Sequence, residues 1–498
     1  MEELLKKYKD KKELIDYYNY ALFIIGFDEA TDCPKKDKQR SLQVQDFFQK
    51  KITDIITSEE YKKMIYELFI HKEELDDVTR LDIEIEYKNM KKMEKIPLDE
   101  LYAHFENLSR SSYEWAIARD TLDYSKFLKE LKENVEFNKK YIKWQQNDKI
   151  KGFDVLLDEM EEGYNQKMYD EFFDVIENEL VPFVEKILKC PKKYNSKLDN
   201  LTFDIDKQKK LTKIIAEKMG YTDQVGCIRE TIHPFTDWAN SNDVRITTSY
   251  DEKLLLSNLY SVMHEIGHAL FQIHMDPKYN GTNIYNNVTC ATHESQSRFY
   301  ENYLGRSRAF VKFLYPILVE LFPSEFEGIV EDDVYYYINS VEAQFKRTEA
   351  DELTYPLHVL IRYKVEKKLF NGEIEVEQME ETFNYYMNKY LHITPSNMKE
   401  GVFQDSHWSS GFGYFPTYAL GSAYGAQFYA QMKKDIDVDG YLEKGDFSPI
   451  NEWLTKNIHQ YSGTKKNLKI INDVCHEDFN PKEYTKYLID KFTKIYLN

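Results

Sequence analysis

Apolar residues recur at steps of three and four along most of this 498-residue chain, and lysine and glutamate alternate on the opposite faces. That spacing is typical of α-helices with one buried side. The clearest stretches run from Leu4 to Ile25, Phe47 to Ile70, Leu98 to Trp115 and Tyr169 to Leu188. There are only 18 Gly and 13 Pro, and no repeat or Gly/Ser linker. We therefore predict one mainly α-helical domain over residues 1–498.

One segment departs from the helical pattern. Residues 243–250, Asp-Val-Arg-Ile-Thr-Thr-Ser-Tyr, alternate apolar and polar side chains and include β-branched residues, which predicts a short strand. An apolar helix is expected to follow it, from about Asp251 to about His274. The free edge of such a strand can hydrogen-bond an extended peptide. An ordinary hairpin strand would show the same pattern.

Charge and cysteine content narrow the function classes. The formal net charge of −19 and the pI of about 5.3 argue against nucleic acid or an anionic membrane surface as the main partner. The five cysteines are widely spaced and include no CxxC pair, so we expect free thiols in a reducing compartment. The chain starts with a charged amphipathic stretch and has no apolar run of about 18 residues. These features predict a cytoplasmic protein.

The expected apolar helix contains the sequence His264-Glu265-Ile266-Gly267-His268, an HExxH motif. Residues four apart lie one turn above each other on a helix, so the two histidines can bind one metal ion. Glu265 would then lie beside the metal, where its carboxylate can take a proton from water. The structural alternative is a pair of core histidines bonded to backbone carbonyls.

A catalytic metal needs at least one more protein ligand, and His293 and Glu294 are both candidates. They lie on a second expected helix that runs to about Leu304, and their side chains point about 100° apart. Two histidines and one glutamate would leave a position open for water, as catalytic sites require. A surface carboxylate is the more common fate of a glutamate.

Further short motifs surround these residues in a fixed order. They are His233-Pro234-Phe235, Asp243-Val244-Arg245-Ile246-Thr247, His293-Glu294-Ser295-Gln296-Ser297, Arg347-Thr348-Glu349-Ala350-Asp351 and Gly401-Val402-Phe403-Gln404-Asp405-Ser406-His407-Trp408. With HExxH, they match the HPF, DxRxT, HES, RxxAD and GxxQDxHW patterns, densely over residues 230–420. In these motifs the chain resembles the thermostable, or Taq-type, carboxypeptidases, family 32 of the metallopeptidases. That family usually has Ile or Val before the Arg of RxxAD. The lysine at position 346 here leaves open which of Lys346 and Arg347 faces the groove.

The resemblance implies a zinc-dependent carboxypeptidase that removes single residues from the C-terminus of peptides. It makes His264, His268 and Glu294 the metal ligands and Glu265 the general base. Cobalt or manganese could replace zinc, because affinity and availability together decide which metal is bound. The resemblance also implies a large, saddle-like helical fold with a deep groove, a small β-sheet beside the HExxH helix, and a homodimer.

An enzyme acting at this end of a peptide must recognise a free carboxylate, and the planar fork of arginine suits that task. Arg347 is the first candidate and Arg245 the second. The alternative for Arg347 is a structural ion pair with Asp351. For Arg245 we favour the structural reading, a pair with Asp243 that could pin the strand to the helix.

Tyrosines and histidines supply further substrate-binding candidates. Tyr414 and Tyr418 lie in or next to a Gly- and Pro-containing loop and could contact the oxyanion or the substrate carboxylate, with core packing equally compatible. His233 and His407 could bind substrate or orient the metal ligands. His407, next to Trp408, could equally be a core histidine.

Two other functions fit part of this pattern. An endo-acting zinc oligopeptidase would use the same metal chemistry without a carboxylate anchor. A metal-free helical scaffold would need none of the catalytic residues, yet every one of them is present.

Overall fold

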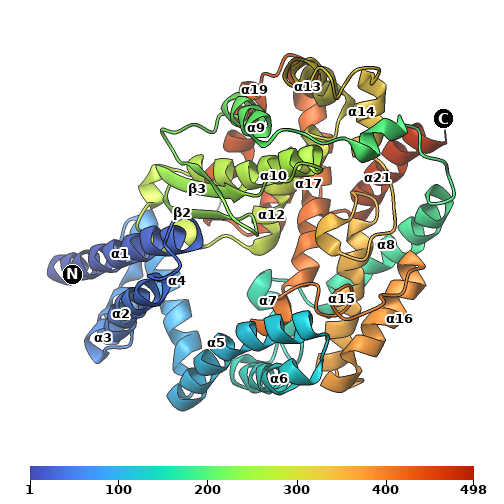
Figure 1. Cartoon of the computed structure of the whole chain (residues 1–498). Helices are drawn as coiled ribbons and strands as arrows, with labels where there is room; N and C mark the ends of the chain where they lie inside the picture. Colours follow the sequence, from blue (N-terminus) through green and yellow to red (C-terminus); the bar gives the residue numbers. More distant parts are fainter. Residues whose placement is uncertain (462, 498) are drawn as a thin grey trace.

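The computed structural model describes residues 1–461 and 463–497. Helices build most of this part of the chain, which confirms the predicted mainly α fold (Figure 1). The first four helices lie together at the left of Figure 1: α1 (Glu2–Ala30), α2 (Lys38–Ile56), α3 (Glu59–Ile70) and α4 (Asp77–Glu94). They enclose a small hydrophobic cluster that includes Tyr61, Ile65 and Leu68.

The other elements pack around a second, much larger hydrophobic cluster. The helices before the sheet are α5 (Leu98–Thr121), α6 (Ser125–Gln145), α7 (Asp154–Met160), α8 (Gln166–Ile187) and α9 (Ile205–Met219). The helices after it are α10 (Leu255–Ile273), α11 (Asn283–Asn286), α12 (Cys290–Arg298), α13 (Arg308–Leu321), α14 (Glu331–Ile338), α15 (Tyr355–Phe370), α16 (Met379–Leu391), α17 (Phe415–Asp435), α18 (Val438–Leu442), α19 (Ser448–Asn457), α20 (Asn467–Cys475) and α21 (Pro481–Tyr496). Helix α17 runs through the middle of this body (Figure 1). None of the helices described is long and apolar enough to cross a membrane.

Helix boundaries differ from the predicted ones at three places. The predicted helix from Phe47 to Ile70 is two helices, because Ser58 adopts an extended backbone and its hydroxyl accepts a hydrogen bond from the Tyr61 backbone N–H. Helix α10 begins at Leu255 rather than near Asp251. Helix α12 ends at Arg298, and the expected continuation to Leu304 is a π-helix, η4 (Phe299–Leu304).

The strand expected at residues 243–250 lies in the centre of the sheet and not at its edge. Within the described residues it has the order β1 (Ile228–Glu230), β3 (Asp243–Thr248), β2 (Thr236–Asn240). β3 pairs with β1 in parallel and with β2 in antiparallel orientation, so the predicted strand exists but both of its edges are occupied. The edge strand beside the cleft is β2. Of the two readings of residues 243–250, the free edge is not found, and the ordinary hairpin strand is the one observed.

Helices α10 and α12 approach each other unusually closely. A Cβ atom on Gly267 of α10 would lie 2.7 Å from the Cα of Ser297 and 2.8 Å from the carbonyl oxygen of Gln296. Gly421 of α17 approaches α12 as closely, because a Cβ atom there would lie 2.8 Å from the carbonyl oxygen of Ala291. These two glycines therefore allow α12 to lie in close backbone contact with both α10 and α17.

Candidate metal centre

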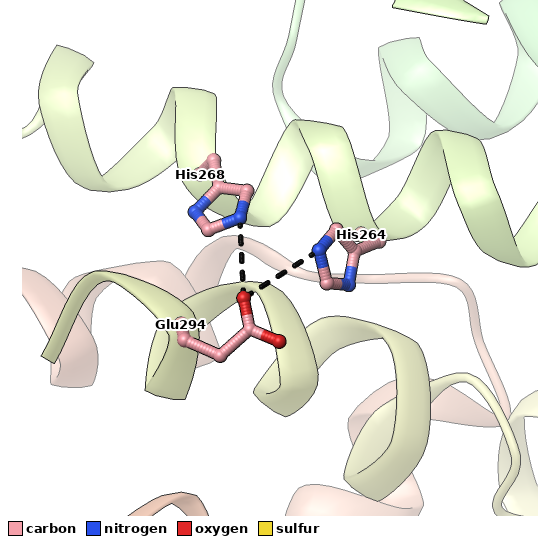
Figure 2. Close-up of side chains that lie close together, drawn as sticks. All are labelled: His264, His268 and Glu294. Atoms are coloured by element: carbon pink, nitrogen blue, oxygen red, sulfur yellow. Dashed lines mark ion pairs between the residues drawn. The ribbon is translucent and has the colours of Figure 1, made fainter. Parts of the chain in front are cut away.

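Three side chains from α10 and α12 converge on one point (Figure 2). His264 and His268 lie one turn apart on α10, and Glu294 faces them from α12. The Nε2 atoms of His264 and His268 lie 3.7 Å and 3.6 Å from the same carboxylate oxygen, Oε2 of Glu294. Ligand atoms at the corners of a tetrahedron with bonds of about 2.1 Å are about 3.4 Å apart. The three residues therefore fit a metal ion of zinc's size.

An ionic network supports the first histidine. Oε2 of Glu301, on the π-helix η4, lies 2.9 Å from Nδ1 of His264. Arg298 donates from Nε to Glu294 at 2.7 Å and from Nη1 to Glu301 at 3.0 Å. Burial opposes ionisation of Glu301, but Arg298 and His264 outweigh it and lower its pKa to about 2. For Glu294 the same balance of burial against Arg298 and the histidines leaves the pKa well below its usual range. Both carboxylates are thus ionised, as a cation site requires.

A partly buried imidazole, that of His293, lies behind the second histidine. Nδ1 of His293 lies 2.5 Å from Nδ1 of His268, and Trp238 of β2 stacks on the His293 ring at 5.1 Å between centroids. Burial, together with His268, lowers the pKa of His293 well below its ordinary value, so this ring is neutral. Of the two candidates for third ligand, only Glu294 has its donor atom facing both Nε2 atoms.

Glu265 is buried beside this centre. Its carboxylate oxygen Oε2 accepts a hydrogen bond of 2.6 Å from the hydroxyl of Thr236 on β2. The same hydroxyl lies 3.0 Å from the Glu265 backbone carbonyl.

All of these residues line a single cleft of about 1120 Å³. Its walls come from the sheet, from α10 and α12, and from the segment around Arg347. Tyr414 and Tyr418 line the same cleft. A bound ligand could therefore contact the metal centre, this arginine and both tyrosines together.

Arg347 lies in the cleft wall within a hydrogen-bonded cluster. It is 6% exposed, and its Nη2 donates to Asp405 at 2.8 Å while Nη1 donates to the hydroxyl of Tyr355 at 3.1 Å. The alternative prediction, an ion pair between Arg347 and Asp351, is wrong. The Asp351 carboxylate instead accepts a hydrogen bond of 2.8 Å from the Thr354 hydroxyl. Of the two basic residues in this segment, Arg347 faces the cleft. The ammonium group of Lys346 instead pairs with Glu349 on the surface.

Tyr418 connects Arg347 to His407. The Arg347 guanidinium lies 4.6 Å from the centre of the Tyr418 ring, and the Tyr418 hydroxyl lies 2.9 Å from Nε2 of His407. His407 itself does not line the cleft. Burial, reinforced by Arg347, lowers the pKa of His407 to about 4. His407 is therefore a neutral partner of Tyr418.

Two predicted substrate-binding residues lie outside the cleft. Arg245 pairs with Asp243 through two hydrogen bonds of 2.8 Å, which is the structural pairing we favoured from the sequence. Its guanidinium also lies 5.0 Å from the Phe23 ring of α1. His233 is exposed in the loop before β2.

Three residues at the centre were not predicted: Thr236, Arg298 and Glu301. Arg298 and Glu301 follow Glu294 by four and seven residues, so a search for helical neighbours of the metal ligand could have found them. Thr236 had no such signal, because only the packing of β2 on α10 brings it to the HExxH glutamate.

Comparison with known proteins identifies the family of this chain. The family described as carboxypeptidase Taq (M32) metallopeptidase matches residues 7–492. The chain therefore belongs to the M32 family and is a metallocarboxypeptidase, which confirms the resemblance seen in the sequence. It is 35% identical to carboxypeptidase 1 of Bacillus subtilis, over 99% of this chain and 98% of that one. It is 30% identical to thermostable carboxypeptidase 1 of Pyrococcus furiosus, over 99% and 100%. A solved structure of the Pyrococcus furiosus carboxypeptidase superimposes with a TM-score of 0.92 at 29% identity, covering 98% of this chain and 99% of that one.

Proposed function

We propose that this metallocarboxypeptidase binds one zinc ion through His264, His268 and Glu294 and removes single C-terminal residues from peptides. The observation that carries the proposal is the position of the Glu294 carboxylate, which faces both histidine Nε2 atoms at nearly equal distance. A zinc ion bound there would lower the pKa of a water molecule to about 7 and polarise the scissile carbonyl. Cobalt and manganese accept the same ligand types, so they are the competing metals.

Glu265 is the general base in this proposal. It is buried beside the ligands on the same helix and lines the cleft. Its carboxylate would take a proton from the attacking water and deliver it to the leaving amine, so that one group serves as base and then as acid. Tyr418 and Tyr414, which line the same cleft, are the candidate donors to the developing oxyanion.

Arg347 is the proposed anchor for the substrate's carboxylate. A guanidinium has five N–H groups. Among the described residues, Nε and one N–H of Nη2 donate to Asp405, and one N–H of Nη1 donates to Tyr355. One N–H on each terminal nitrogen is left, which suits a carboxylate bound through two parallel hydrogen bonds. The free edge of β2 could pair with the peptide backbone upstream of the cleaved bond.

Paired peptides test the exopeptidase reading. We expect release of the C-terminal residue from a peptide with a free carboxylate and no cleavage of the same peptide with a C-terminal amide. Internal cleavage of the amidated peptide would favour the endo-acting alternative. Treatment with a chelator should abolish turnover, and addition of zinc, cobalt or manganese in turn should show which metals restore it. A protein that holds no stoichiometric metal and remains active after chelation would contradict the metal centre.

Glu265→Gln tests the base separately. The amide is nearly isosteric but cannot take a proton, so kcat should fall by roughly 10²–10⁴-fold while bound metal stays at one ion per chain. Retained turnover would show that another group is the base.

A further inference from the structure

Strand β2 presents two alternate side chains toward the metal centre. Thr236 and Trp238 are separated by one residue, so they lie on the same face of the strand. The Thr236 hydroxyl donates to the Glu265 carboxylate at 2.6 Å, and the Trp238 ring stacks on His293, the residue behind His268. The edge strand therefore contacts both the proposed base and the support of one ligand.

Glu265 depends on this contact for its orientation. A glutamate side chain has three rotatable bonds, and the last of them is only weakly restricted. Among the residues that the structure describes, no other side chain donates a hydrogen bond to the Glu265 carboxylate. The contact fixes Oε2 against the sheet, which determines where the second oxygen, Oε1, can lie.

The uncharged nature of the Thr236 hydroxyl also suits a hydrogen-bond donor to a catalytic base. The two neighbouring carboxylates, Glu294 and Glu301, are both held by the cationic Arg298, which stabilises their ionised forms. The donor to Glu265 is a neutral hydroxyl on a β-branched residue with few rotamers, fixed in a strand. Such a donor orients a carboxylate without placing a cation beside it.

We propose that Thr236 is a positioning residue for catalysis, which holds Oε2 of Glu265 so that Oε1 faces the attacking water. This inference rests on the proposed role of Glu265 as the base. It assigns to the edge strand a part in the reaction that is separate from binding the peptide backbone.

Thr236→Val removes the hydroxyl at nearly constant shape and is the main test. A hydrogen bond to a charged group contributes enough to change a rate by about tenfold or more. We expect kcat to fall by roughly 10- to 30-fold, KM to stay within about twofold, and bound metal to stay at one ion per chain. Thr236→Ser keeps the hydroxyl and should restore most of kcat.

Thr248→Val is the matched control. Thr248, on β3, also links the sheet to α10, through a hydrogen bond of 2.8 Å to Asn258 near the start of the helix. Thr248 lies outside the cleft lining, so loss of this hydrogen bond should lower the melting temperature without changing kcat or KM. If the valine variant at position 236 does not fold, Thr236→Ala provides the same comparison.

The outcomes separate this inference from the proposed function. Wild-type kcat in Thr236→Val, alongside an inactive Glu265→Gln, would overturn the positioning role and leave the base assignment intact. A raised KM with unchanged kcat would overturn it as well, because the hydroxyl would then be contacting substrate. An active Glu265→Gln would remove the base assignment, and the inference with it. A selective fall in kcat that serine restores supports it.

Discussion

Arg298 shows how one side chain sets the charge state of the whole centre. Its guanidinium spans Glu294 and Glu301, with hydrogen bonds of 2.7 Å and 3.0 Å. Each carboxylate keeps Oε2 close to a histidine: Glu294 toward both Nε2 atoms, and Glu301 toward Nδ1 of His264. A histidine held at Nδ1 by an ionised carboxylate keeps Nε2 free for a metal. This partly buried arginine thus stabilises both the ligand Glu294 and Glu301, the residue that orients the ligand His264.

The two arginine candidates for the substrate anchor give opposite predictions. Arg347→Lys keeps a positive charge beside Asp405 but loses the planar fork. We expect kcat/KM for peptides with a free C-terminus to fall by about 10- to 100-fold, since one or two charge-assisted hydrogen bonds are lost. Arg245→Lys, outside the cleft, should leave kcat/KM within about twofold of wild type and lower stability only.

Steady-state kinetics on a series of peptides, with melting temperatures for each variant, measure both effects. An unchanged kcat/KM in the Arg347 variant would remove this residue as anchor. A large loss in the Arg245 variant, at an unchanged melting temperature, would assign the anchor there instead.

At the scale of elements, the site depends on the spacing of α10 and α12. Gly267 allows the two backbones to touch, since a Cβ there would lie 2.7 Å from Ser297 Cα. Gly267→Ala should therefore push α12 away and move Glu294 from its position opposite the two histidines. We expect metal affinity to fall by about tenfold or more and the free energy of unfolding to fall by about 1–3 kcal/mol.

Gly411→Ala is the control for that substitution. Gly411 has no neighbouring atom within 4 Å of an added Cβ and does not need a positive φ. Isothermal titration with zinc and denaturant unfolding should show wild-type values for this variant. Unchanged zinc affinity in Gly267→Ala would show that the helix spacing tolerates an added methyl group.

Sequence patterns predicted the individual helices and strands better than the contacts between them. The HExxH helix and the strand at 243–248 are present, because strong apolar periodicity is a local property. The sequence left open whether this strand has a free edge, since the pairing of Ile228–Glu230 with β3 depends on a distant segment. The break at Ser58 carried a local signal, a serine before two glutamates, that the longer apolar pattern concealed.

At the scale of the whole molecule, the site joins segments that are far apart in sequence. Arg347 pairs with Asp405, 58 residues later, and Thr236 reaches Glu265, 29 residues later. Residue spacing along one helix could predict the two histidine ligands, but not such contacts between separate segments. The motif resemblance led to the correct family and to the helical fold. The homodimer and the cytoplasmic location remain predictions.

Acid sensitivity of the folded state is the last property to follow from the structure. Burial lowers the pKa of His407 to about 4, from an ordinary value of 6.5. The unfolded chain therefore binds a proton at this residue between about pH 6.5 and pH 4, and the folded chain does not. The stability that the neutral ring contributes is full above pH 6.5 and is lost as the pH falls to 4. The shift corresponds to up to about 3 kcal/mol.

His407→Gln keeps a polar partner for Tyr418 but cannot titrate. We expect the unfolding free energy of the wild type, minus that of the variant, to decrease as the pH falls from 7 to 4, by up to about 3 kcal/mol. Taking the difference cancels the titration of the metal ligands, which both proteins share. Because burial is the main cause, the decrease should persist in high salt, where a shift caused by exposed charges would shrink. A difference that stays constant with pH would show that His407 has the same pKa in the folded and the unfolded protein.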